Sequence, residues 1–206
     1  MQSRSKIPIW FVFILVSLLA GCATASPPFT DDFSDPASGW GASSHETYVR
    51  GYQQGRYLFQ IDVPRLLVWA VSGRTYTDVE LEVIGKAAGQ PDNHFGLVCR
   101  YRDEQFYYFA ISSDGYYGIF LMDAEGDLHP LGARAMLRSP VIHTDGTDNR
   151  IAASCMGSTL TLYVNGQQVA QVQDETYTSG DVGMAAGALS QGGASIWFDD
   201  FEATRP

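Results

Sequence analysis

The strongest constraint on the fold is a β-hairpin signal in the segment TLTLYVNGQQVAQV. Leu160, Leu162 and Val164 alternate with more polar residues, and the alternation ends at Asn165-Gly166. This dipeptide accepts positive φ at both turn positions, as the tightest hairpin turns require. The alternation also places the three apolar side chains on one face of a strand, where a core can bury them. The segment therefore predicts two antiparallel strands joined by a two-residue turn.

The same period of two residues recurs along the chain, and turn residues separate the segments. No stretch of ten or more residues after residue 22 has a convincing helical stripe of apolar residues. A low charged fraction (17%), with 21 glycines and 13% aromatic residues, also favours short strands over helices. We therefore predict an all-β fold in which two antiparallel sheets pack face to face as a sandwich. The expected strands lie in residues 77–83, 95–101, 105–112, 116–122, 149–157, 159–172 and 194–203.

The first 22 residues have the pattern of a bacterial lipoprotein signal. Arg4 and Lys6 precede a mostly apolar run that is short for a membrane span. The run ends in Leu-Ala-Gly-Cys, which resembles the lipobox, the motif in which the cysteine thiol is lipidated and the chain is then cut before it. Cys22 is therefore the predicted lipidation site. The alternative is an ordinary signal peptide with an incidental cysteine.

This interpretation divides the chain into three parts. We expect residues 1–21 to be removed, residues 22–28 to form a lipidated cysteine with a short tether, and residues 29–206 to form one β-sandwich domain. The protein would then be exported and anchored by lipid to the bacterial cell membrane or outer membrane. Its domain would face the exterior or the periplasm.

The net charge limits the partners of such a domain. The formal charge of the whole chain is −10, and removal of residues 1–21 takes away two basic residues and no acidic one, which gives −12. An acidic chain is repelled by nucleic-acid phosphates and by anionic lipid head groups. We therefore expect no nucleic-acid partner, and membrane contact through acyl chains rather than through a basic patch.

Two cysteines remain after Cys22 is assigned to lipidation. Cys99 and Cys155 form an even pair in a chain predicted to be exported, and thiols in such an oxidising setting commonly form a bridge. Two cysteines without a C-x-x-C spacing or a paired histidine make a poor zinc site. We predict a Cys99–Cys155 disulfide, with two buried free thiols as the alternative.

Five motifs follow one another along nearly all of residues 29–203. They are DDFSDPASGW, YTDVELEV, FGLVCRYRDEQFYYFAISSDGYYGIF, LTLYVNGQQV and the terminal WFDDFEA. In the order of these motifs the mature chain resembles the concanavalin A-like (laminin-G-like) jelly-roll superfamily, in particular exported bacterial modules related to the 3-keto-disaccharide hydrolase domain. The resemblance implies a jelly-roll sandwich, in a superfamily that mixes enzymes, lectins and adhesion modules.

The resemblance also implies that the first and last strands lie side by side, which would bring two Asp-Asp-Phe motifs together. Asp32 and Asp200 belong to these motifs. Their carboxylates are candidate ligands of a structural Ca²⁺ ion, which prefers oxygen ligands. The alternative is that these aspartates are turn residues whose side chains bond to the backbone. We expect no other cofactor.

A row of carboxylates offers a candidate catalytic site. Asp78, Glu80 and Glu82 alternate on one strand face, and retaining glycosidases use two carboxyl groups about 5–5.5 Å apart. Laminarinase-type jelly-roll hydrolases carry a comparable row, but here the central aspartate is missing. The row is therefore interpreted first as a solvated strand face. The resemblance to the 3-keto-disaccharide hydrolase domain keeps a second enzymatic alternative open, although its catalytic positions cannot be assigned to residues of this chain.

A carbohydrate-binding role fits more of the sequence. Glycan-binding sandwiches present aromatic rings to sugar C–H faces, with a few polar groups nearby. If Cys99 faces the core, strand alternation directs Arg100 and, on the neighbouring strand, Tyr108 away from it. We expect Trp69, Arg100 and Tyr108 to line a shallow site for glycans. The alternatives are that these aromatics are ordinary cross-strand pairs, and that the chain is an accessory envelope protein without a small-molecule ligand.

Overall fold

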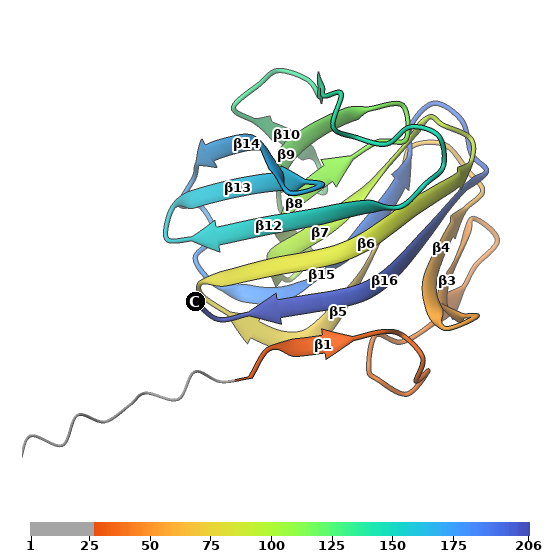
Figure 1. Cartoon of the computed structure of the whole chain (residues 1–206), viewed down its shortest axis with the longest axis horizontal. Helices are drawn as coiled ribbons and strands as arrows, with labels where there is room; N and C mark the ends of the chain where they lie inside the picture. The colour runs from red at the N-terminus through yellow and green to blue at the C-terminus, as the bar shows by residue number, and fades with distance from the viewer. Residues whose placement is uncertain (1–26) are drawn as a thin grey trace, which may run out of the picture.

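The computed structural model describes residues 27–206, in which sixteen strands form two antiparallel sheets (Figure 1). This part of the chain contains no helix, so nothing in it is a helical span long enough to cross a membrane. The predicted signal of residues 1–21 and the lipidation site Cys22 lie outside the described residues.

The larger sheet has nine strands and contains both ends of the domain. Its order is β14-β13-β12-β6-β16-β4-β3-β2, and β1 pairs with β16 beyond the end of β4. The first and last strands therefore lie side by side, as the jelly-roll resemblance implies. The strands are β1 (Phe29–Asp31), β2 (Ser43–Ser44), β3 (Tyr48–Gln53), β4 (Arg56–Ile61), β6 (Val79–Gly89), β12 (Asn149–Met156), β13 (Thr159–Val164), β14 (Gln167–Gln173) and β16 (Ala194–Thr204).

The smaller sheet has seven strands and lies against the first. Its order is β10-β9-β8-β7-β15-β5, and β11 pairs with the free part of β9. The strands are β5 (Leu66–Tyr76), β7 (Asn93–Arg102), β8 (Gln105–Ile111), β9 (Tyr116–Met122), β10 (Leu128–Leu131), β11 (Leu137–Arg138) and β15 (Gly180–Ala188). The all-β two-sheet sandwich predicted from the sequence is confirmed.

Side-chain alternation builds the core between the sheets. Val79, Leu81 and Val83 of β6 are at most 2% exposed, as are Phe95 and Leu97 of β7 on the facing sheet. Each strand thus contributes every second residue to the core, as its sequence pattern predicts. The β13–β14 hairpin is also confirmed, because its two turn residues have φ values of 50° and 80°.

A disulfide links the two sheets. Cys99 of β7 and Cys155 of β12 are both fully buried, and their Cα atoms are 7.0 Å apart. The bond closes a loop with a sequence separation of 56 residues. The pairing predicted from the cysteine count is confirmed, and it joins the layers at one end of the sandwich.

A β-bulge directly after Cys99 changes which side chains reach the core. Cys99 is opposite Tyr107 and Arg102 is opposite Gln105, so two residues of β7 oppose one residue of β8. Arg100 takes a φ of 55° at this bulge. The backbone of β15 passes close by, because a Cβ atom on Gly180 would lie 2.4 Å from the carbonyl carbon of Arg100. The bulge reverses the alternation of the residues that follow it.

Candidate functional site

The main candidate site is a hollow on the outer face of the seven-stranded sheet, with a volume of about 590 Å³. Trp69 of β5 and His94 of β7 lie within it. The turn between β9 and β10 forms one wall, and Arg65 and Leu189, from the connections at the far end, line another part. A hollow of this size, with an aromatic ring and a few polar groups, has the properties of a small-ligand site.

Small residues of β15 give the hollow its depth. Ala185 lies opposite Trp69, and Gly187 lies opposite both Leu67 and His94. A Cβ atom on Gly187 would be 2.3 Å from Nε2 of His94. The missing side chain at Gly187 therefore leaves the space that the imidazole ring occupies.

His94 is a buried and neutral member of the site. The side chain of Tyr108 lies beside it, with 3.1 Å between Nδ1 of His94 and the tyrosine hydroxyl oxygen. Burial lowers the pKa of His94 to about 4, against an opposing effect of the Asp92 carboxylate. The ring is therefore uncharged at neutral pH. Among residues 27–206 no side chain or backbone group bonds to Nε2, so this nitrogen is free to bond to a ligand in the hollow.

Trp69 supplies the aromatic surface of the site. It is half-buried, and its ring packs on Phe106 and Tyr101, with centroid distances of 5.4 and 6.4 Å. These neighbours belong to a second apolar cluster, on the outer face of the sheet rather than between the sheets. They fix the orientation of the indole, and such a fixed ring is suited to stacking on a flat apolar surface of a ligand.

The wall formed by the β9–β10 turn carries carboxylates. Asp123 accepts hydrogen bonds from the backbone N–H groups of Asp127 (2.8 Å) and Glu125 (3.1 Å). The bond from Asp127, and after it the contact with the His129 ring, lower the pKa of Asp123 below its usual value, so its side chain is ionised. Glu125 itself is exposed, as is Glu104 in the β7–β8 turn, and both line the hollow.

The predicted ligand-binding residues do not come together as expected. Trp69 lies in the hollow, but Tyr108 is fully buried beneath His94, although it does point to the outer face of the sheet. Arg100 is 1% exposed and lies on the other side of the sheet. The prediction of an exposed Arg100 beside Tyr108 is wrong, because the bulge turns Arg100 inward and sends Tyr101 to the outer face.

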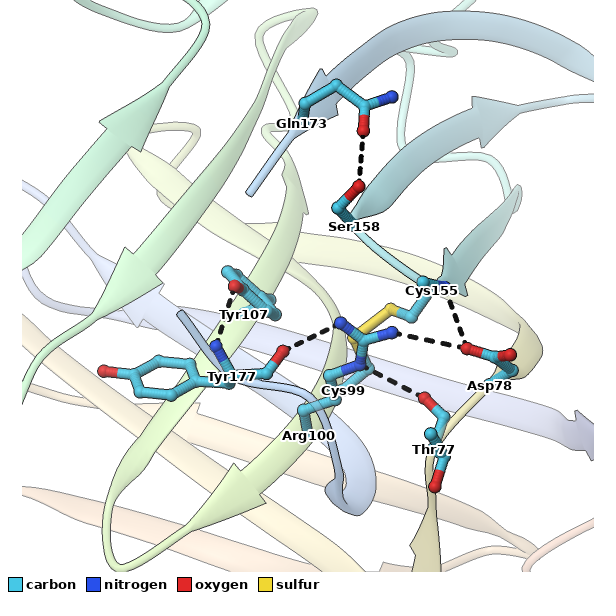
Figure 2. A network of polar contacts seen from close by, with 10 residues as sticks. Thr77, Asp78, Cys99, Arg100, Tyr107, Cys155, Ser158, Gln173 and Tyr177 are labelled. Carbon is cyan, nitrogen blue, oxygen red and sulfur yellow. Dashed lines mark hydrogen bonds and ion pairs between the residues drawn. A yellow bond between two sulfur atoms is a disulfide. The ribbon is translucent and has the colours of Figure 1, made fainter. Parts of the chain in front are cut away.

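Arg100 instead holds together one end of the sandwich (Figure 2). Its guanidinium donates to the carbonyl oxygens of Thr77 (3.2 Å) and Tyr177 (2.8 Å), and lies 3.6 Å from a carboxylate oxygen of Asp78. The backbone N–H of Tyr177 donates to the hydroxyl of Tyr107 at 3.0 Å. This network fixes the segment between β14 and β15, which crosses from one sheet to the other beside the disulfide.

The predicted carboxylate row lies at the nine-stranded sheet. Glu80 and Glu82 point to its outer face, where Glu82 pairs with Arg150, and they line a separate hollow of about 380 Å³. Asp78, just before β6, accepts the backbone N–H of Gly157 at 2.8 Å. The thickness of both sheets therefore separates this row from the Trp69 hollow, and the two cannot form one active site.

The strands of the seven-stranded sheet carry a single carboxylate, that of Asp181 in β15. This carboxylate accepts hydrogen bonds from the Ser72 hydroxyl (2.9 Å) and from the backbone N–H groups of Gly73 (2.7 Å) and Arg74 (2.9 Å). It is thus occupied in holding a bulge of the neighbouring strand. The strands beneath the Trp69 hollow offer no carboxylate pair of the kind that glycosidases use.

The two aspartates that were predicted to bind Ca²⁺ form an incomplete set of ligands. Asp32 and Asp200 line one shallow hollow near β1, and Asp32 accepts a hydrogen bond from the Ser34 hydroxyl (2.6 Å). No group of three or more His, Cys, Asp or Glu residues within residues 27–206 could hold a metal ion. Ca²⁺ takes six to eight oxygen ligands, so these two carboxylates do not by themselves make its site. Calcium binding stays a prediction.

The sequence interpretation missed His94, Glu104, Asp123 and Glu125. Alternation did contain a signal for His94, since Phe95 and Leu97 face the core and their neighbours must face outward. The three carboxylates come from turns, whose approach to Trp69 depends on how the strands are ordered in the sheet.

Comparison with known proteins gives the fold a name. No family model and no curated protein matches this chain. A β-glucanase of Bacillus licheniformis is similar in structure, with a TM-score of 0.65 at 11% identity over 89% of this chain and 100% of that one. The fold is a jelly-roll sandwich. Its resemblance to the 3-keto-disaccharide hydrolase domain stays a prediction.

Two proteins of Bacillus subtilis share this fold. One is the carbohydrate-binding module CBM66, with a TM-score of 0.57 at 11% identity. The other is a protein of unknown function with a galectin-like fold, with a TM-score of 0.65 at 9% identity. Each comparison covers 88% of this chain and 97% of the other chain. At these identities the likeness shows the fold alone.

Proposed function

We propose that the protein is an exported, lipid-anchored module that binds carbohydrate in the Trp69 hollow. The observation that carries this proposal is the pairing of a fixed, half-buried indole with the unbonded Nε2 of a neutral imidazole in one hollow. An indole can stack on the C–H face of a sugar, and Nε2 of His94 can form a hydrogen bond with a sugar hydroxyl, as donor or acceptor according to the tautomer. The fold is shared with a carbohydrate-binding module and a β-glucanase, which supports this class of ligand.

Binding is favoured over hydrolysis by the position of the carboxylates. A retaining glycosidase needs a nucleophile and an acid about 5–5.5 Å apart, flanking the bond that is cut. The floor of the hollow provides an imidazole, an indole and small apolar residues instead, and the carboxylates of Glu104, Asp123 and Glu125 come from two turns at its walls rather than from the strands beneath it. Glu80 and Glu82 lie on the opposite sheet, away from any sugar stacked on Trp69.

Trp69→Ala is expected to weaken carbohydrate binding by roughly 10- to 30-fold, which is the effect of losing an aromatic anchor. The measurement is affinity electrophoresis against a panel of polysaccharides, followed by calorimetry on those that retard the protein. Trp197→Ala is the matched control, because Trp197 is a half-buried tryptophan on the outer face of the nine-stranded sheet. Equal carbohydrate affinities of Trp69→Ala and Trp197→Ala would contradict the proposal. Release of sugar from a polysaccharide by the wild-type protein, lost in Glu80→Gln, would also contradict it.

The lipid anchor rests on the Leu-Ala-Gly-Cys motif and is tested separately. Cys22→Ser removes the thiol, so the protein is expected either to remain an unprocessed precursor or to leave the membrane fraction. Metabolic labelling with a fatty acid, combined with membrane fractionation, reports both outcomes. Ser17→Ala, in the same segment, is the control and should keep the label. A soluble wild-type protein without acyl label would rule out the anchor.

A further inference from the structure

The charges around the Trp69 hollow are predominantly negative. Glu104, Asp123 and Glu125 line it from two turns, whereas Arg65 is its one lining arginine or lysine among the described residues. A fourth carboxylate, that of Asp92, lies close enough to raise the pKa of His94 against the effect of burial. A ligand in the hollow therefore experiences an excess of negative charge.

The residues at the base of the hollow do not offset this negative charge with a positive one. His94 is 8% exposed, its pKa is about 4, and its Nε2 faces the hollow without a protein partner in residues 27–206. The imidazole thus presents a neutral hydrogen-bonding atom rather than a cation. Burying an anionic group of a ligand beside it would leave that charge unpaired, at a considerable cost in binding free energy.

Trp69 also favours a cationic ligand over an anionic one. The face of an indole attracts a cation that lies within about 6 Å of the ring. The carboxylates of Glu104 and Glu125 are exposed, so they can turn toward a positive group placed above the ring. A hollow lined by both an indole and exposed carboxylates is suited to recognising an ammonium group.

From these observations we propose that the hollow selects saccharides that carry free amines, and rejects saccharides that carry carboxylate or sulfate groups. The inference rests on the proposed carbohydrate binding and names its ligand class. The sugar ring would stack on Trp69, and one of its hydroxyl groups would form a hydrogen bond with Nε2 of His94. Its ammonium group would lie against the carboxylates of Glu104 and Glu125.

The test compares three tetrasaccharides with the full chain in mild detergent, by calorimetry, at a pH where amines are protonated. We expect the glucosamine tetramer to bind about fivefold tighter than the N-acetylglucosamine tetramer, and the galacturonate tetramer to bind weakest. Raising the ionic strength from about 0.1 M to about 1 M shortens the screening length from about 10 Å to about 3 Å, so it should remove most of the difference.

The double variant Glu104→Gln, Glu125→Gln should erase the preference for glucosamine, so that the glucosamine and N-acetylglucosamine tetramers bind with equal affinity. Glu46→Gln with Glu80→Gln is the charge-matched control, since both glutamates are exposed and lie outside the hollow. Equal affinities for the amine and the N-acetyl tetramer, with Trp69→Ala still weakening both, would overturn the amine selectivity alone. Absence of binding by any oligosaccharide would overturn the proposed function together with it.

Discussion

Replacing Cys99 and Cys155 together by alanine is expected to lower the free energy of unfolding by about 4 kcal/mol. The native bond closes a loop with a sequence separation of 56 residues, and in the chain-entropy model the unfolded chain regains this freedom when the bond is absent. For a domain of this size, such a loss lowers the melting temperature by about 8 to 16 °C.

Thermal unfolding of the oxidised protein, the reduced protein and the double variant measures this effect. The reduced wild-type protein should melt at a temperature near that of the double variant, because both lack the cross-link. The reduced protein also keeps both sulfur atoms in the core, so it separates the effect of the cross-link from the effect of lost packing. A reduced protein that melts with the oxidised one would show that the cross-link contributes no stability.

Arg100→Met is expected to cost about 2–4 kcal/mol of unfolding free energy. The substitution removes the donors that bond the carbonyl oxygens of Thr77 and Tyr177, and because both hydrogen bonds are only part-buried, each carbonyl left without a partner should cost about 1–2 kcal/mol. Asp78 contributes little to this loss, because its side chain is 46% exposed and keeps the bond from the Gly157 N–H.

Urea unfolding of Arg100→Met and Arg102→Met tests this assignment. Arg102 is in the same strand with a side chain that is 81% exposed, and its replacement should change stability by less than about 0.5 kcal/mol. Hydrogen exchange should also become faster in residues 174–179, the segment that Arg100 holds. Equal stability of the two variants would mean that the buried guanidinium has no structural role.

Alternation and turn chemistry predicted most of the sandwich. Asn165-Gly166 gave the hairpin, and the every-second-residue pattern of β6 and β12 identified their core faces. Counting cysteines then gave the disulfide. These features depend on residues near one another in sequence, or on a pair with one available partner, so they can be derived without knowing the order of the strands.

The candidate site was less predictable because it depends on a bulge and on strand order. A bulge residue that has a positive φ is usually glycine, but here Arg100 takes that conformation, and the sequence FGLVCRY has no glycine at this position to indicate a bulge. The orientation assigned to Arg100 was therefore reversed. The direction of Tyr108 was right, but its burial follows from neighbouring side chains such as that of His94, which alternation alone does not show.

The position of the disulfide has a mechanical consequence. A chain held at its N-terminal end while a ligand fills the hollow carries tension across the sandwich, because β1 belongs to one layer and the hollow to the other. Such a pull tends to separate the layers, and packing contacts between them can give way one after another. The bond between β7 and β12 is a covalent link between the layers within residues 27–206, and it does not yield in this manner. The disulfide therefore keeps the two layers joined under a pull between the N-terminal end of the domain and a ligand in the hollow.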